Sequence, residues 1–225
     1  MRLDGIRACV FDAYGTLFDV NSAAASCAAE LGPKWQPLAE LWRAKQLQYT
    51  WLRSLGGRYA DFEQVTGEAL DFAMESLGVE DTALRTRLMD LYLRLGAYTE
   101  VGDTLTQLKA RGLKLAILSN GSPAMLSAAV SNAGITELLD AVLSVDELRV
   151  YKPHPSVYQL AVDRLAVAPS EICFVSSNGW DAFSAKAFGM RVVWCNRSGQ
   201  PRERIPAAPD AEIATLTALS SIVDA

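Results

Sequence analysis

Four short clusters of polar residues in this 225-residue chain could together carry out nucleophilic chemistry. In chain order they are DAYGT (12–16), SNG (119–121), Lys152 and SSNGWD (176–181). Between them the clusters supply two carboxylates, one ammonium group, and several hydroxyl and amide groups. An aspartate can act as a covalent nucleophile when it is held unprotonated and partly desolvated beside a cation. The set therefore points to chemistry through an aspartyl ester, which water would then hydrolyse.

The candidate nucleophile is Asp12, because Lys152 would lower the pKa of its carboxyl group. Thr16, Ser119 and Ser176 would orient the reacting groups and donate hydrogen bonds. The second carboxylate, in the last cluster, could activate or position the hydrolytic water.

Each cluster taken alone has a simpler structural interpretation. Asp12 would be a turn or cap residue, and Asp181 the charge in the first turn of a helix. The segment 119–121 would be a turn, Lys152 a surface lysine, and Trp180 a core residue. We favour the chemical interpretation because the clusters follow successive predicted strands in the order that one site requires.

The elements that must position these clusters follow from the hydrophobic pattern. Short apolar runs predict strands at 6–11, 113–118, 141–145, 171–175 and 190–195. Helical stretches are predicted between them at 101–111, 123–133, 155–166 and 181–188. This alternation predicts an α/β fold with a Rossmann-like parallel sheet and helices on both faces. In such a sheet, ligands bind in the crevice outside the carboxyl ends of the strands, where the clusters would meet.

Residues 18–97 show no strand signal and are predicted to form an inserted helical domain. Helices are predicted from a cap at Asn21 to residue 31, over 37–55, after a cap at Asp61, and around Leu84 to Leu95. The predicted organisation is an α/β core of residues 1–17 and 98–225, with a helical cap domain of residues 18–97 lying over it.

Composition excludes several classes of function. The net charge is −5 and no Lys/Arg cluster occurs, which argues against nucleic-acid binding. The single histidine, His154, excludes a site built from several imidazoles. No targeting or membrane-spanning segment is expected. The four cysteines lack metal-ligand spacing, and three fall in apolar runs, so we expect a reduced, cytoplasmic protein.

The chain resembles the haloacid dehalogenase superfamily of aspartate-nucleophile hydrolases and, more narrowly, the L-2-haloacid dehalogenases. The resemblance rests on FDAYGTL (11–17), SNG (119–121), KP (152–153) and SSNGWD (176–181), with WRAKQL (42–47) and GRYADF (57–62) in the insertion. It implies hydrolytic dehalogenation of short-chain L-2-haloalkanoic acids to D-2-hydroxy acids. Asp12 would displace halide from the α-carbon with inversion. Water positioned by Asn178 and Asp181, assisted by Lys152, would then cleave the ester.

The resemblance also implies how the substrate is held. Arg43, Asn120 and Trp180 would cradle the leaving halide, because guanidinium, amide and indole edges suit an anion. Leu47 and Phe62 would pack against the alkyl part of the substrate. The alternative for Arg43 is an exposed helix residue whose stem covers apolar surface, and Leu47 and Phe62 could simply be core residues.

The substrate carboxylate would be bound by Ser119 and by the backbone N–H groups of Ala13 and Tyr14. Tyr158 would position Lys152. The resemblance further implies a homodimer, with a small 2-haloacid, water and the halide product as the other partners.

Two positions separate this chain from the phosphatases of the superfamily. Tyr14 stands where those enzymes place a second aspartate, the general acid, which a weakly basic halide does not need. Ser177 stands where they place a Mg²⁺-binding aspartate, so we expect a site with no metal or other cofactor. The alternatives are a Mg²⁺-dependent phosphatase that tolerates Tyr14, and a related hydrolase acting on a fluorinated or strained-ring small carboxylic acid. A non-catalytic binding protein is a third.

Overall fold

The computed structural model describes residues 2–224 and contains a six-stranded parallel sheet. The strands are β1 (Ala8–Phe11), β2 (Lys114–Ser119), β3 (Ala141–Ser144), β4 (Ile172–Ser176), β5 (Arg191–Cys195) and β6 (Ala211–Ile213). Their order across the sheet is β3-β2-β1-β4-β5-β6. In the central strand Val10 pairs with Ala116 of β2 and Phe174 of β4. Every residue of β1 is buried, as expected for a strand covered on both faces.

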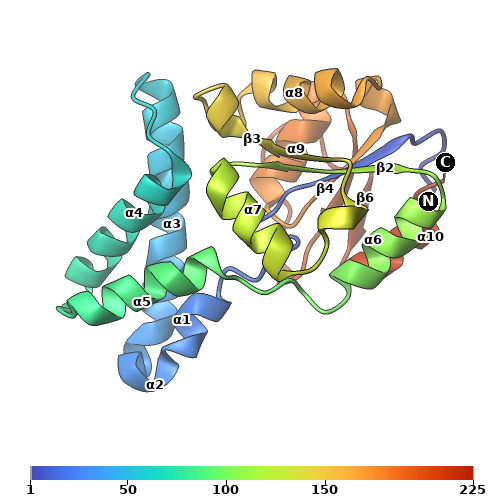
Figure 1. The fold of residues 1–225 in the computed structure, drawn as a ribbon. Coiled ribbons are helices and arrows are strands. Elements are labelled where there is room, and N and C mark those ends of the chain that lie inside the picture. The colour runs from blue at the N-terminus through green and yellow to red at the C-terminus, as the bar shows by residue number, and fades with distance from the viewer. Residues whose placement is uncertain (1, 225) are drawn as a thin grey trace.

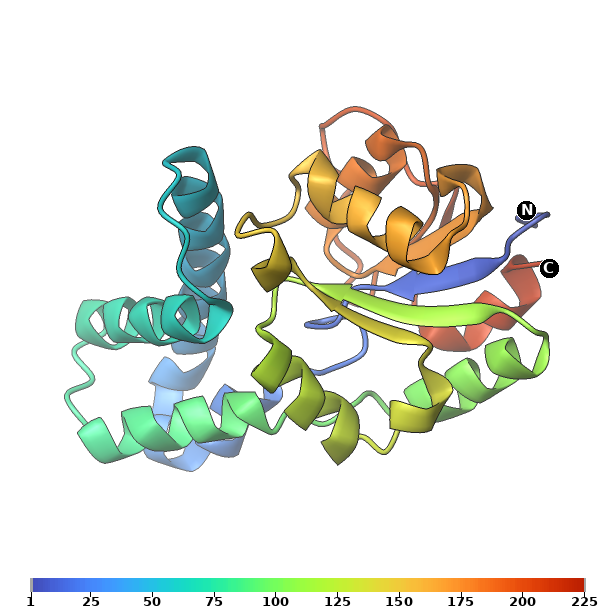
Figure 2. The same ribbon diagram turned by 45° about the horizontal axis from the view of Figure 1, so that its top comes forward.

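Five helices cover the two faces of the sheet. They are α6 (Val101–Ala110), α7 (Pro123–Asn132), α8 (Pro155–Leu165), α9 (Gly179–Phe188) and α10 (Leu219–Ile222). Helices α8 and α9 lie on one side of the strands, and α6, α7 and α10 lie on the other (Figures 1 and 2). Four 3-10 turns complete this part, at Thr136–Leu138, Val145–Glu147, Pro169–Glu171 and Leu216–Ala218. The prediction of a Rossmann-like α/β fold is confirmed.

The insertion between β1 and α6 is helical and lies beside the sheet (Figure 1). Its elements are α1 (Ser22–Ser26), α2 (Ala28–Leu31), a 3-10 turn (Gly32–Lys34), α3 (Trp35–Leu55), α4 (Phe62–Ser76) and α5 (Thr82–Leu93). The side chain of Asp61 accepts from the N–H of Gln64 at 2.8 Å and caps α4 as predicted. None of the helices in residues 2–224 combines the length and the apolar character needed to cross a membrane.

The two connections between insertion and sheet lie side by side. The N–H of Tyr98 donates to the carbonyl of Leu17 at 2.9 Å, and the N–H of Asp19 donates to the carbonyl of Gly96 at 3.1 Å. These contacts support the boundaries 17/18 and 97/98, which we propose as the limits of cap and core. The outermost residues of the proposed core, 1 and 225, lie outside the described part of the chain.

Two local predictions are wrong. Asn21 makes no side-chain cap, and the helix expected to run to residue 31 is interrupted at Cys27. The Ser26 hydroxyl donates to the carbonyl of Ser22 at 2.7 Å, a contact that commonly bends helices. The strand β6 was not predicted, because three residues with Glu212 in the middle give little apolar signal.

Candidate active site

The four polar clusters meet at the carboxyl ends of neighbouring strands. Asp12 directly follows β1, while Ser119 and Ser176 end β2 and β4. Because β1 lies between β2 and β4 in a parallel sheet, the three strand ends share one edge. Lys152 comes from the segment between β3 and α8 and reaches the same place.

Asp12 is 6% exposed, and its carboxylate is held by three donors. Lys152 Nζ lies 3.2 Å from Oδ1, while Thr16 Oγ1 donates to Oδ2 at 3.0 Å. Asn178 Nδ2 donates to the same Oδ2 at 2.8 Å. Thr16 is itself oriented, because its Oγ1 accepts from the N–H of Ser177 at 2.8 Å. These contacts fix the direction of the carboxylate.

Lys152 is 1% exposed and lies between two buried carboxylates. Its Nζ donates to Asp181 Oδ2 at 2.8 Å in addition to Asp12. Burial alone would lower the pKa of Lys152, but the two carboxylates outweigh burial and hold the pKa above its ordinary value. The backbone is fixed too, since Asn120 Oδ1 accepts from the N–H of Lys152 at 3.0 Å. The ammonium is therefore a permanent positive charge beside Asp12.

Tyr158 reaches Lys152 only through Asp181. The Tyr158 hydroxyl donates to Asp181 Oδ1 at 2.7 Å, and the opposite oxygen of the carboxylate accepts from Lys152. Burial raises the pKa of Tyr158, which keeps this hydroxyl protonated as a donor. Asp181 is fully buried, and burial raises its pKa against the opposing effect of Lys152. With both oxygens engaged, Asp181 is placed to orient the ammonium more than to hold a water.

Arg43 of α3 extends from the insertion to the strand ends. Its Nη2 donates to Asn178 Oδ1 at 3.2 Å and lies 3.4 Å from the carbonyl of Tyr14. Its Nη1 donates to Gln46 Oε1 at 2.6 Å. Gln46 is buried and also donates to Thr66 Oγ1 at 2.7 Å.

Gln46 was not predicted to belong to the site. Its position three residues after Arg43 in one helix, where side chains share a face, is a signal that was present. Arg197 was also missed: it donates to the carbonyl of Thr16 at 2.9 Å and pairs with Glu100 at 2.7 Å. It follows β5, so applying the rule of strand ends to the fifth strand identifies it.

Apolar side chains from both parts of the chain surround this polar centre. The Phe62 ring is buried, with its centroid 5.6 Å from that of Tyr14. Trp180 makes an edge contact with Trp51 of α3, at 5.4 Å between ring centroids. Half-buried Leu47 lies on the same face of α3, one turn from Arg43 and one turn from Trp51. Trp180 Nε1 is buried without an acceptor in residues 2–224, and a bound anion could accept from it.

The remaining predicted residues shape the loops. The N–H groups of Ala13 and Tyr14 donate to no acceptor in the described chain, so they are free to bind a ligand. Ser119 Oγ accepts from the N–H of Gly121 at 3.1 Å and is fully buried. Ser176 Oγ accepts from the N–H of Asn178 at 3.1 Å, which supports the last cluster.

The donor set does not fit a magnesium ion. Mg²⁺ needs oxygen ligands in octahedral geometry, and here the Lys152 ammonium already lies between the carboxylates of Asp12 and Asp181. Ser177 adds only a neutral hydroxyl. Within residues 2–224, no group of three or more His, Cys, Asp or Glu side chains is arranged to hold a metal ion.

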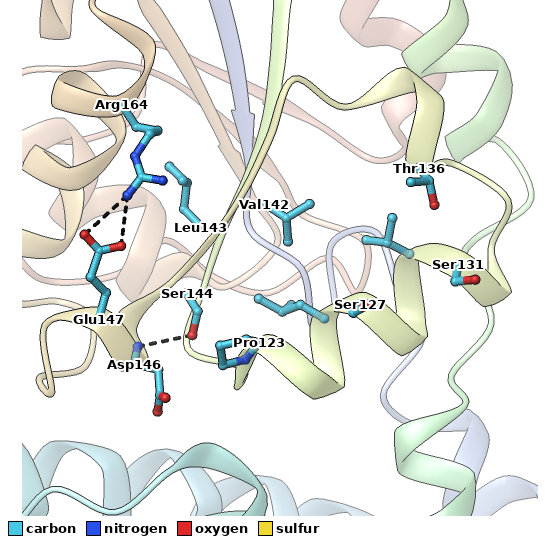
Figure 3. Close-up of a pocket in the computed structure, with 12 residues that line it drawn as sticks. Pro123, Ser127, Ser131, Thr136, Val142, Leu143, Ser144, Asp146, Glu147 and Arg164 are labelled. Carbon is cyan, nitrogen blue, oxygen red and sulfur yellow. Dashed lines mark hydrogen bonds and ion pairs between the residues drawn. The ribbon is translucent and has the colours of Figure 1, made fainter.

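A further cavity lies away from this chemistry. Its volume is about 640 Å³, and it is formed by α7, the edge strand β3 and the pair Glu147–Arg164 (Figure 3). None of the predicted site residues lines it.

The chain is similar over nearly its whole length to proteins of known activity. A family model described as haloacid dehalogenase-like hydrolase matches residues 6–189. The (S)-2-haloacid dehalogenase 1 of Pseudomonas sp. strain CBS-3 is 51% identical over 222 residues, which cover 98% of both chains. A dehalogenase solved as an intermediate complex has a TM-score of 0.96 at 47% identity, covering 98% of both chains. The L-2-haloacid dehalogenase of Xanthobacter autotrophicus, solved with chloropropionic acid covalently bound, has a TM-score of 0.89 at 42% identity, covering 96% of this chain and 97% of that one.

Proposed function

The chain belongs to the haloacid dehalogenase-like hydrolases, and from that premise we propose that Asp12 is the nucleophile of an (S)-2-haloacid dehalogenase. The enzyme hydrolyses short-chain L-2-haloalkanoic acids to D-2-hydroxy acids through an aspartyl ester. The observation that carries the assignment of Asp12 is its set of three donors, Lys152, Thr16 and Asn178. This set holds a nearly buried carboxylate in one orientation beside a positive charge.

In the first step a carboxylate oxygen of Asp12 attacks the α-carbon from the side opposite the halogen. The carbon–oxygen bond forms as the carbon–halogen bond breaks, and the halide leaves with the electron pair. In-line attack inverts the carbon, so an L substrate gives a D product. The N–H groups of Ala13 and Tyr14, with Ser119, bind the substrate carboxylate and set its α-carbon in line.

The halide leaves toward Arg43, Asn120 and Trp180. The Arg43 guanidinium already extends to Asn178 beside the nucleophile, so its charge is within reach of the leaving group. The unpartnered Trp180 Nε1 supplies a further donor. Leu47 and Phe62 contact the alkyl part and exclude water, which strengthens these charge interactions.

In the second step water attacks the carbonyl carbon of the ester, not the α-carbon. The acyl–oxygen bond breaks, the product hydroxyl takes one proton of the water, and Asp12 is regenerated as a carboxylate with release of the other. We assign Asn178 to position this water. Lys152 stabilises the negative charge that develops on the ester oxygen, with Asp181 and Tyr158 holding the ammonium in place.

The first test is chloride release from (S)-2-chloropropionate in the presence of excess chelator. We expect steady release and stoichiometric D-lactate, with no release from the R enantiomer. Added Mg²⁺ is expected to leave the rate unchanged, because the ammonium of Lys152 takes the place of a metal between the carboxylates. Chelator-sensitive cleavage of a phosphate ester without chloride release would favour the phosphatase alternative.

The alternative on a fluorinated or strained-ring acid uses the same attack by Asp12 with another leaving group. No feature of the site favours it. Fluoroacetate and a small epoxide carboxylic acid serve as comparison substrates, and faster turnover of either than of (S)-2-chloropropionate would contradict the assignment.

We also propose a homodimeric, cytoplasmic enzyme. An exposed aromatic side chain on the cap is compatible with the dimer: Phe72 of α4 is 38% exposed, and it meets Tyr49 of α3 edge-on. The buried, unbridged cysteines are compatible with a reducing compartment. Light scattering during size-exclusion chromatography is expected to give about 49 kDa, twice the 24.4 kDa chain, and a 24.4 kDa species at micromolar protein would contradict the dimer.

A further inference from the structure

Gln46 is a buried polar residue of α3 whose shortest hydrogen bond goes to Arg43. It is 1% exposed, and its Oε1 accepts from Arg43 Nη1 at 2.6 Å. Its Nε2 donates to Thr66 Oγ1 at 2.7 Å, and the Tyr92 hydroxyl oxygen lies 3.1 Å from the same nitrogen. A buried amide destabilises the fold unless it is hydrogen-bonded, and here both of its polar atoms have partners. The amide thus joins α3, α4 and α5 through one buried polar network.

The direction of the hydrogen bonds in this network is fixed. Arg43 can only donate, so the Gln46 atom that faces it must be the carbonyl oxygen. The Thr66 hydroxyl donates its one hydrogen to the carbonyl of Phe62 at 2.6 Å, so it can only accept from Gln46. A rotated amide would place two donors together at Arg43 and two acceptors together at Thr66. Gln46 is therefore held with its oxygen toward Arg43.

Holding one nitrogen of Arg43 sets the direction of the other, because the guanidinium is planar and rigid. With Nη1 on Gln46, Nη2 donates to Asn178 Oδ1 at 3.2 Å, and Asn178 in turn donates to Asp12. A second direction is open to this flexible side chain. A narrow cavity of about 10 Å³ lies between α1 and α3 and is lined by Arg43, Gln46 and Asn21 among others. It has room for about one water, which could accept from a guanidinium turned away from the strand ends.

We propose that Gln46 is a positioning residue for the departure of the halide. It keeps the positive charge of Arg43 turned toward the leaving group and away from α1. The inference rests on the proposed function, in which the halide leaves toward Arg43, and Gln46 acts only through that side chain. Because the charge stabilises the departing halide, Gln46 affects formation of the Asp12 ester more than its hydrolysis.

The test is kcat/KM of Gln46→Met for (S)-2-chloropropionate and (S)-2-bromopropionate, since kcat/KM covers the steps up to halide departure. Methionine is similar in size to glutamine but accepts hydrogen bonds only weakly. We expect kcat/KM for the chloro acid to fall by about 10- to 100-fold, the usual effect of losing a hydrogen bond to a charged group. Chloride is the poorer leaving group and depends more on Arg43. The bromo-to-chloro ratio should therefore rise by about threefold or more.

A merely structural role for Gln46 would not change this ratio. A destabilised variant contains fewer folded molecules, which lowers both values of kcat/KM by the same factor. Thr66→Val is the second variant, because it removes the acceptor that fixes Nε2 while leaving Gln46 and Arg43 in the chain. Its bromo-to-chloro ratio should rise in the same direction by a smaller factor.

Gln48→Met is the matched control, since it makes the same replacement on the exposed side of α3. Gln48 accepts from Lys45 at 2.8 Å, and this pair is exposed. Both of its kcat/KM values should stay within about twofold of wild type. An unchanged ratio in Gln46→Met, or an equal rise in Gln48→Met, would overturn the positioning role and leave the proposed function standing. Absence of halide release from both acids in the wild-type protein would overturn the proposed function and this inference with it.

Discussion

Replacing Asp12 with Asn will abolish chloride release from (S)-2-chloropropionate, lowering kcat by at least about 10⁴-fold. The amide is a far weaker nucleophile than the carboxylate and carries no charge to pair with Lys152. The fold should survive, because Asn178 and Thr16 can still donate to the amide oxygen that replaces Oδ2. Ion chromatography of released chloride measures the loss, and near-wild-type release would overturn the assignment of Asp12.

Asp19→Asn is the matched control, since it removes one negative charge from the loop that follows β1. Asp19 caps a turn by accepting from the N–H of Asn21 at 3.0 Å and contacts none of the proposed catalytic groups. Its activity should stay within about twofold of wild type.

Turnover in ¹⁸O-labelled water distinguishes ester formation from direct attack by water. Over many turnovers the label enters the carboxylate of Asp12, because water cleaves the acyl bond of the ester. Mass spectrometry of the peptide containing Asp12 reads this out. Rapid turnover with an unlabelled peptide would assign attack on the α-carbon to water.

The location of the site could be predicted from the sequence because it depends on chain topology. Once the apolar runs are parallel strands, the residues that follow them must meet at one edge, and Asp12, Ser119 and Ser176 do so. The central part of the fold is likewise dictated by strands too apolar to face water. The short strand β6 was not predicted from the sequence, because pairing with β5 stabilises it more than its own composition does.

The pairing of groups within the site could not be predicted in the same way. Which oxygen of Asp181 accepts from Tyr158 and which from Lys152 depends on side-chain directions that spacing does not encode. The packing of the insertion against the core is equally non-local. It decides that Arg43 reaches Asn178 and that Trp51 meets Trp180, contacts that join segments far apart in the chain.

Lys152→Met will remove both the activity and much of the stability. Two buried carboxylates, Asp12 and Asp181, lose the ammonium that compensates for their desolvation. Breaking a buried ion pair from one side typically costs about 3–5 kcal/mol of unfolding free energy. We expect a loss of that size in urea denaturation at pH 7, with kcat lower by about 10²- to 10³-fold. In the wild-type protein the pKa of Lys152 is higher in the folded state than its ordinary value of 10.5. The charge of Lys152 therefore stabilises the folded state fully below pH 10.5. This stabilisation is lost only as the pH rises through the higher folded-state pKa.

The double variant Lys152→Met/Asp181→Asn separates the catalytic role of the ammonium from its structural role. The neutral amide that replaces the Asp181 carboxylate would need no counter-charge and could still accept from Tyr158, so more than about 1 kcal/mol of the lost stability should return. Activity should not return, because the charge beside Asp12 is still missing. For the single variant Lys152→Met, the free energy of unfolding should also rise as pH falls. Burial raises the pKa of Asp181, so the folded state takes up a proton there. Recovery of chloride release in the double variant would reduce Lys152 to a counter-ion for Asp181. Recovery of stability alone shows that the same buried charge supports the fold through Asp181 and the reaction through Asp12.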